Sequence, residues 1–186
     1  MPIAGSARTG LFNKVFLAGI RNAILSDPDW NEGFYGDKPP IRGLRQFGRI
    51  YAGWGFSEPF YRHEVFKTAF GAASVEEFIE TFWEAFFVKC DANNLLAQLW
   101  TWEHNDISAH PRFGGDLEKA LESIKARTIL LPPATDAYFP PVDNEAEARH
   151  IAQAQCRPIP TIWGHMCPMN PEDGRFIDQA LAEALA

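Results

Sequence analysis

The sequence lacks a long apolar run. The longest that we find, residues 15–20, has about six residues and contains a glycine. A membrane-spanning helix needs roughly 20 apolar residues, so we expect no bilayer span. The first residues also lack the basic segment and the longer apolar stretch of a secretory signal. Together these absences favour a cytoplasmic protein.

Clustered positive charge is also absent. The 17 Lys and Arg residues are outnumbered by 24 Asp and Glu, which gives a formal net charge of −7, and no basic stripe stands out along the chain. An acidic surface of this kind does not attract phosphate backbones or anionic lipids. We therefore expect neither nucleic acid nor a membrane surface as the main partner.

Cysteine is scarce, with only Cys90, Cys156 and Cys167. Their number is odd and their spacing lacks the paired ligands of a zinc site, so we expect reduced thiols, no metal site and no bound cofactor. Cys167 lies two residues after His165 and is a candidate nucleophile or metal ligand. No second pair of ligands with suitable spacing accompanies it, which disfavours the metal role.

Apolar residues make up 46% of the 186 residues, enough to bury the core of a single domain. The first part of the chain is helical in pattern, with a capping box at Ser74 and Glu77 and a capping aspartate at Asp91. Apolar residues recur there at the spacing of amphipathic helices. The predicted helices cover residues 11–25, 43–54, 59–69, 75–86 and 92–104.

The last third of the chain alternates between helical and strand patterns. Two short β-branched and apolar runs that contain prolines, within residues 127–133 and 157–165, predict strands that end at Leu131 and Trp163. Residues 2–7 have the pattern of a strand end followed by a turn. Because helices alternate with strands here, we predict an α/β fold with a partial parallel sheet of about three strands. The predicted helices cover residues 116–124, 144–152 and 171–185.

Two side chains follow the ends of the predicted strands, where reactive groups of parallel sheets gather. Asp136 comes shortly after the first strand and His165 directly after the second, 29 residues later. A carboxylate beside an imidazole fixes its tautomer and stabilises the imidazolium, as a general base requires. Taken singly, each residue is more often a turn or surface group, so it is their shared position that favours catalysis. The order Asp before His also matches the end of an α/β-hydrolase triad.

Five phrases of the sequence, in this order, resemble the homoserine O-acetyltransferase-like family of the α/β-hydrolase fold. The resemblance extends over nearly the whole chain, and it ends in the two phrases that contain Asp136 and His165. The phrases are residues 5–13 (GSARTGLFN), 27–35 (DPDWNEGFY), 43–49 (GLRQFGR), 135–141 (TDAYFPP) and 163–165 (WGH).

The resemblance implies that Asp136 is the triad acid and His165 the triad base of an acyl transfer or ester hydrolysis. It further implies that residues 1–9 end a core strand, that residues 10–115 form a helical lid over an acyl-acceptor tunnel, and that residues 116–186 form the C-terminal core segment. A small-molecule acyl donor such as acetyl-CoA is then a candidate substrate, together with an acyl acceptor. Arg49, in the third phrase, is a candidate for binding an anionic part of the substrate.

The sequence departs from the family in two respects. None of its six serines lies in a Gly-x-Ser-x-Gly pattern, so the nucleophile and the oxyanion hole are expected upstream of residue 1. Met166 follows His165, where homoserine acetyltransferases carry an aspartate that contacts the amino-acid substrate. A hydrolase or another acyltransferase is therefore nearly as well supported as homoserine acetylation.

The sequence is compatible with two hypotheses about the function of the chain. In the first, the chain is one part of a serine acyltransferase or hydrolase, nearly inactive by itself, which requires a complementary N-terminal half. In the second, it is a binding module derived from that fold, in which Asp136 and His165 have no catalytic role. Because a sheet cut before its sixth strand exposes an edge and an apolar face, we expect the isolated chain to form dimers or aggregates.

Overall fold

The computed structural model describes residues 1–185, which form two compact units. The sheet unit comprises Met1–Thr9, Trp54–Pro59 and residues 105–185, and the helical unit comprises Gly10–Gly53 and Phe60–His104. Residues 54–59 and 105–115 thus belong to the sheet unit, whereas the resemblance assigned them to the helical lid. In the described part of the chain, no helix combines the length and apolar character that a membrane crossing would require.

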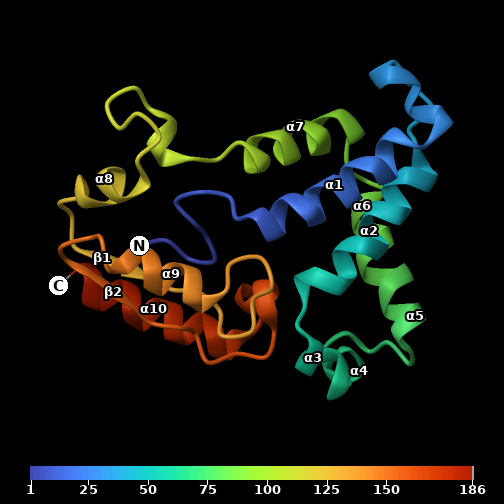
Figure 1. Ribbon diagram of the computed structural model, residues 1–186. Helices are drawn as coiled ribbons and strands as arrows, with labels where there is room; N and C mark the ends of the chain where they lie inside the picture. The colour runs from blue at the N-terminus through green and yellow to red at the C-terminus, as the bar shows by residue number, and fades with distance from the viewer. Residues whose placement is uncertain (186) are drawn as a thin grey trace. The chain divides into compact units, whose positions relative to one another are not determined.

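Between residues 11 and 104 the chain is helical, with short connections (Figure 1). The segment at Ile79–Glu84 is a π-helix continuous with its neighbours, and Pro28–Gly33 is a 3₁₀-helix. The helices are α1 (Leu11–Leu25), η1 (Pro28–Gly33), α2 (Ile41–Gly55), α3 (Glu58–Arg62), α4 (Val65–Phe70), α5 (Val75–Phe78), η2 (Ile79–Glu84), α6 (Ala85–Phe87) and α7 (Ala92–Glu103).

The helix that the sequence predicted over residues 59–69 is instead divided into α3 and α4. Glu64 lies between them with φ of 51°, in the left-handed region. A right-handed helix cannot pass through a residue in this conformation, so the chain must turn there. The predicted caps are present: the Ser74 hydroxyl accepts a hydrogen bond from the Glu77 N–H, and Asp91 accepts one from the Asn94 N–H.

Aromatic rings form the centre of the helical unit. The rings of Phe47 and Phe87 lie 4.6 Å apart, and Tyr51 lies 5.2 Å from Phe87 and 5.4 Å from Trp83. Phe47 and Trp83 are almost completely buried. These contacts join α2 to η2 and α6, and because large rings bury much apolar area, they supply a major part of the unit's stability.

Two glycines of α2 have different environments. A Cβ atom added at Gly48 would lie 2.9 Å from the Trp83 carbonyl oxygen and 3.2 Å from the Glu84 nitrogen, whereas one at Gly53 would meet no atom within 4 Å. Gly48 is therefore the point at which α2 and η2 approach backbone to backbone. Gly53 is exposed and has no comparable packing role.

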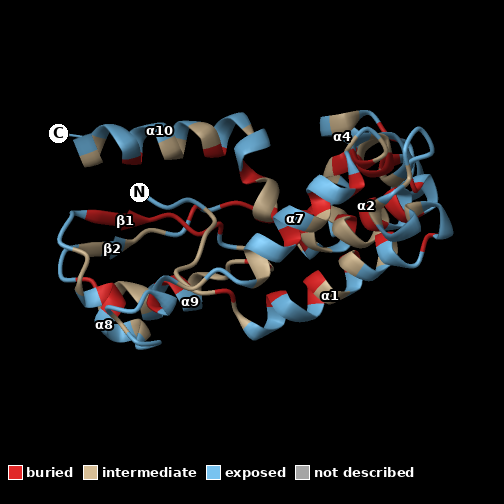
Figure 2. Cartoon of the chain, turned by 90° about the horizontal axis from the view of Figure 1, so that it is seen from above, coloured by how far each residue is buried: buried red, intermediate tan, exposed pale blue. Residues whose placement is uncertain are grey.

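The sheet unit contains two parallel strands, β1 (Thr128–Leu130) and β2 (Ala154–Cys156), with Thr128 opposite Ala154. On the other edge of β1, Ile3 forms an isolated parallel bridge with Leu131. The described residues thus contain two strands, extended by isolated bridges, where the sequence predicted about three strands. Figure 2 shows α10 (Pro171–Leu185) on one side of the sheet and α8 (Leu117–Glu122) and α9 (Pro141–Ala148) on the other.

Two boundaries in this unit differ from the sequence prediction. The second strand lies at Ala154–Cys156 rather than at residues 157–165, because Pro158 and Pro160 have no N–H to donate to a ladder. Only an isolated bridge between Pro133 and Ile159 continues the pairing. The connecting helix α9 begins at Pro141, whose fixed φ suits the first helical position.

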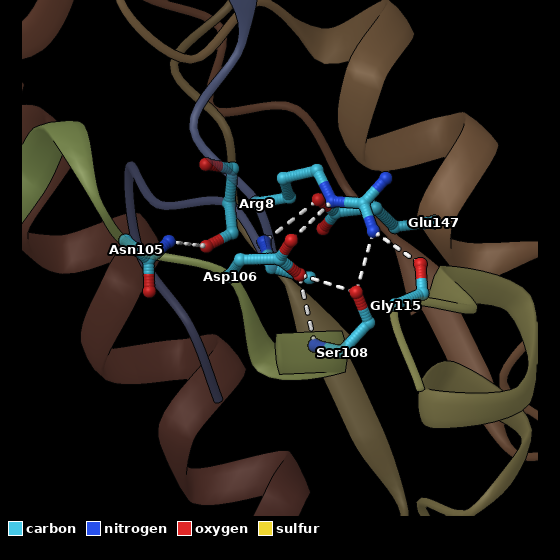
Figure 3. A network of polar contacts seen from close by, with 8 residues as sticks. Arg8, Asn105, Asp106, Ser108, Gly115 and Glu147 are labelled. Atoms are coloured by element: carbon cyan, nitrogen blue, oxygen red, sulfur yellow. Dashed lines mark hydrogen bonds and ion pairs between the residues drawn. The ribbon is translucent and has the colours of Figure 1, made fainter. Parts of the chain in front are cut away.

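A polar network anchored on Arg8 holds the N-terminal segment in the sheet unit (Figure 3). The guanidinium donates to Asp106 Oδ2 at 2.9 Å, to Ser108 Oγ at 2.5 Å and to the Gly115 carbonyl at 2.9 Å. The Ala7 N–H donates to the Glu147 carboxylate of α9 at 2.8 Å. Residues 5–9 are thereby fastened to residues 105–115 and to α9.

Substitution at Gly48 tests the close approach of α2 and η2. We expect Gly48→Ala to lower the free energy of unfolding by about 1–3 kcal/mol, because the new methyl group must push two backbones apart. The matched variant Gly53→Ala adds the same methyl group to the same helix in open space and should raise stability by up to about 1 kcal/mol. Urea unfolding followed by circular dichroism measures both values, and equal effects would contradict the role of Gly48.

Candidate active site

Asp136 lies in the loop that follows β1 and is buried, with 4% of the residue exposed. Its own N–H donates to the Pro133 carbonyl, which forms a tight turn directly after the strand. Its Oδ1 accepts the N–H of Tyr138 at 2.8 Å, and Oδ2 faces the Nδ1 of His165 at 3.1 Å. Both carboxylate oxygens therefore have partners, and the plane of the carboxylate is fixed.

His165 is in the first turn of the short 3₁₀-helix η4 (Gly164–Met169), and its side chain is 26% exposed. Because an ionised carboxylate only accepts hydrogen bonds, the contact with Asp136 places the proton of a neutral imidazole on Nδ1. Nε2 is then the nitrogen that can take a proton from another group. A partly exposed imidazole backed by a buried carboxylate is the arrangement of a general base.

Aromatic rings enclose the imidazole. The Tyr138 ring meets it edge to face, with centroids 5.0 Å apart, and the Phe139 ring lies 5.6 Å away. The Tyr138 ring also stacks on the Trp54 ring, with centroids 5.9 Å apart. Sequence reasoning did not assign a role to these rings, although Tyr138 and Phe139 belong to the phrase that contains Asp136.

The segment Trp54–Pro59 packs directly against the turn that contains His165. A Cβ atom at Gly164, which has φ of 59°, would lie 2.9 Å from the Ser57 nitrogen and 3.2 Å from the Gly55 carbonyl oxygen. The Ser57 hydroxyl donates to the Ile162 carbonyl. Only glycine combines this backbone conformation with so close an approach.

Arg49, the candidate for binding a substrate anion, lies in α2 within the helical unit. Its guanidinium contacts Glu84 at 2.5 Å and Glu76 at 2.6 Å, with Glu80 at 3.8 Å. The hydrogen bond with Glu76 raises the pKa of the Arg49 guanidinium. Because these carboxylates already neutralise its charge, the structure gives Arg49 a part in an ion-pair cluster, and binding of a substrate anion stays a prediction.

Cys167 is fully buried in an apolar cluster with Ile129, Leu131, Ile159 and Ala180. Burial, together with the negative charges of Asp173 and Asp136, raises the pKa of its thiol to about 12. A thiol in this state is a poor nucleophile. Within residues 1–185, no group of three or more His, Cys, Asp and Glu side chains is arranged to hold a metal ion.

No model of a known protein family matches this chain. It is 34% identical over 185 residues to a probable esterase of Corynebacterium glutamicum, which covers 98% of this chain and 52% of that protein. It is also 34% identical over 188 residues to an ethyl acetate hydrolase of Pseudomonas veronii, with 99% and 53% covered. A homoserine O-succinyltransferase of Neisseria meningitidis is 30% identical over 164 residues, with 82% and 43% covered. The chain thus spans about half the length of the curated relatives it matches.

Two solved structures have the same fold over almost the whole chain. An acetylester hydrolase from Corynebacterium glutamicum superimposes with a TM-score of 0.90 at 32% identity, covering 98% of this chain and 52% of that one. The acetyl esterase MekB superimposes with a TM-score of 0.94 at 33% identity, covering 98% and 53%. Both are similar to this chain in sequence as well as in fold.

The tight packing at Gly164 can be tested by adding one methyl group. We expect Gly164→Ala to lower the free energy of unfolding by about 1–3 kcal/mol, because the methyl group meets backbone atoms of residues 55–57 and the positive φ is unfavourable for alanine. Gly174→Ala in α10, where a Cβ meets nothing within 4 Å, is the control and should not destabilise the protein. Thermal and urea unfolding measure both variants.

The state of Cys167 predicts a pattern of thiol reactivity. In the native protein at neutral pH, we expect iodoacetamide to modify Cys90 and Cys156, which are half-buried, and to leave Cys167 unmodified. In denaturant all three thiols should react. Peptide mass spectrometry gives the site of each modification, and rapid native labelling of Cys167 would contradict its burial and restore it as a candidate nucleophile.

Proposed function

We propose that this chain, which belongs to the homoserine O-acetyltransferase-like family of the α/β-hydrolase fold, takes part in ester hydrolysis. In this proposal the substrates are small acyl esters and the nucleophile is a serine. The observation that carries the proposal is the contact between His165 Nδ1 and Asp136 Oδ2, which joins the segments that follow two adjacent parallel strands. In the proposed mechanism, His165 is the general base and Asp136 orients it.

In the proposed reaction, Nε2 of His165 removes the proton of a serine hydroxyl while the serine oxygen attacks the carbonyl carbon of the ester. The negative charge of Asp136 stabilises the imidazolium that forms. The imidazolium then donates the proton to the departing alcohol, which leaves an acyl-enzyme ester. Water attacks this ester in the same way while His165 takes its proton, and the imidazolium returns that proton to the serine oxygen as the acid is released.

The nucleophilic serine is proposed to lie outside these 186 residues. None of the serines here lies in a Gly-x-Ser-x-Gly pattern, and the relatives are about twice as long as the matched region. The 186 residues alone are accordingly proposed to be nearly inactive, because a triad without its nucleophile and oxyanion hole loses most of its rate. The helical unit is the candidate for the lid.

An ester is favoured over homoserine as the substrate for two reasons. The two relatives that are 34% identical are named as an esterase and an ethyl acetate hydrolase. In addition, Met166 follows His165, where the resemblance to homoserine acetyltransferases would require an aspartate that contacts the amino-acid substrate. A thioether cannot pair with the ammonium group of an amino acid, so recognition of homoserine would be weak.

Acyl transfer to homoserine is the second candidate, because homoserine O-succinyltransferases are among the relatives. The two candidates share the acyl-enzyme and differ only in whether water or an alcohol attacks it. When homoserine is supplied with an acyl donor such as acetyl-CoA, the ratio of O-acylhomoserine to free acid distinguishes them.

A chimaera tests the proposal. The half of the Pseudomonas veronii ethyl acetate hydrolase that this chain does not match is joined to this chain, and hydrolysis of 4-nitrophenyl acetate is measured. We expect the chimaera to hydrolyse the ester and the 186-residue chain alone to show almost no activity. His165→Ala and Asp136→Asn should each lower kcat of the chimaera by about 10⁴-fold. The first variant removes the base that takes the serine proton, and the second removes the carboxylate that orients this base.

The exposed histidine His63 provides the matched control, since His63→Ala removes the same side chain and should leave kcat unchanged. A folded chimaera that hydrolyses the ester equally well with and without His165 would refute the catalytic role. The chain would then be better described as a binding module.

A further inference from the structure

One hydroxyl group connects the two loops that hold Asp136 and His165. Thr135 Oγ1 donates a hydrogen bond to the Thr161 carbonyl at 2.9 Å and accepts one from the Gly164 N–H at 3.2 Å. Thr135 directly precedes Asp136, and Gly164 directly precedes His165. A single side chain therefore ties together the residues adjacent to both members of the pair.

The second loop is fixed in turn by a buried carboxylate. Thr161 Oγ1 donates to Asp173 Oδ2 at 2.5 Å and accepts the Trp163 N–H at 3.0 Å. Thr161 and Asp173 are each 5% exposed. Asp173 lies in the first turn of α10, where the helix dipole favours a negative charge. The hydrogen bonds thus lead from α10 through Thr161 to Thr135.

We propose that Thr135 is a positioning residue, whose hydroxyl sets the distance between the Asp136 carboxylate and the His165 imidazole by fastening the two loops to each other. The inference extends the proposed function, because the pair that it positions is the proposed acid–base pair. Thr135 does not contact either functional group itself. Its hydroxyl acts through the main chain instead: it donates to the Thr161 carbonyl and accepts from the Gly164 N–H.

A hydroxyl group can donate and accept hydrogen bonds at once, which explains why threonine suits position 135. One O–H donor and two lone pairs allow it to serve a carbonyl and an N–H at the same time. Valine has the same shape and can do neither, so Thr135→Val would leave the Gly164 N–H and the Thr161 carbonyl without this partner. Serine keeps the hydroxyl and loses only the methyl group.

Nuclear magnetic resonance of the 186-residue chain gives a readout that does not depend on activity. With the imidazole neutral, the Nδ1–H of His165 is held by Asp136 and should exchange slowly with water. We expect Thr135→Val to accelerate this exchange about tenfold, the factor that corresponds to one hydrogen bond of ordinary strength. It should also raise the share of the Nε2–H tautomer in the nitrogen spectrum. Thr135→Ser should restore the wild-type behaviour of both signals.

Thr128→Val is the matched control, because Thr128 is likewise a threonine of the sheet unit whose hydroxyl donates to a backbone carbonyl, that of Ala126. This variant should lower the melting temperature and leave the His165 signals unchanged. The proposal is overturned if Thr135→Val and Thr128→Val destabilise the chain alike and neither alters the His165 exchange rate or tautomer. Should Thr135→Val fail to fold, Thr135→Ala is compared with Thr135→Ser in the same way.

The chimaera separates this proposal from the proposed function. A positioning role predicts that Thr135→Val lowers kcat for 4-nitrophenyl acetate with little change in KM, and that Thr135→Ser restores kcat. If the chimaera is inactive while the His165 signals respond to Thr135→Val as described, the positioning role holds and the proposed function fails. If the chimaera is active, and neither kcat nor the His165 signals change in Thr135→Val, the positioning role fails and the proposed function holds.

Discussion

The parallel pairing of β1 with β2 determines where the side chains of Asp136 and His165 lie. In a parallel pair the chain leaves both strands at the same edge of the sheet, so the loops that follow β1 and β2 are necessarily neighbours. The helix α9 makes the return between them. The contact between His165 and Asp136, 29 positions apart in the sequence, depends on this topology. Pro158 and Pro160 end the regular ladder early, yet the bridge between Pro133 and Ile159 keeps the two loops side by side.

Topology alone leaves the distance between the two loops undetermined. Local contacts fix the position of each loop. Gly164 packs against the backbone of residues 55–57, which a side chain would prevent. The Tyr138 N–H fixes the carboxylate of Asp136, and the Tyr138 ring lies against the imidazole. The turn at His165 is thus held on several sides. Such support fits the proposed role of His165 as a general base, because an imidazole displaced by about an ångström would lose much of its rate advantage.

The helical unit is stabilised in a different way. Its centre is a set of aromatic rings around Phe47 and Trp83, and its ion pairs include Arg49 with Glu84, which is 8% exposed. An arginine so placed satisfies a nearly buried carboxylate that would otherwise be costly. The segment 43–49 would have the same sequence whether Arg49 paired with glutamates or bound a substrate anion. The sequence therefore does not distinguish these two roles.

The sequence by itself determined the order of the elements, the helix caps at Ser74 and Asp91, and the choice of Asp136 and His165. These features depend on local chemistry: capping hydrogen bonds, apolar periodicity, and the position of a side chain just after a strand. The break at Glu64 and the early position of β2 were not predictable, since a left-handed residue and a strand boundary depend on what packs around them. Only the tertiary structure brought Thr135, Thr161 and Asp173 together, because their hydrogen bonds join segments distant in sequence and follow no spacing rule. Sequence chemistry therefore named the proposed acid–base pair, while packing and hydrogen bonds between distant segments decided how the two side chains are held.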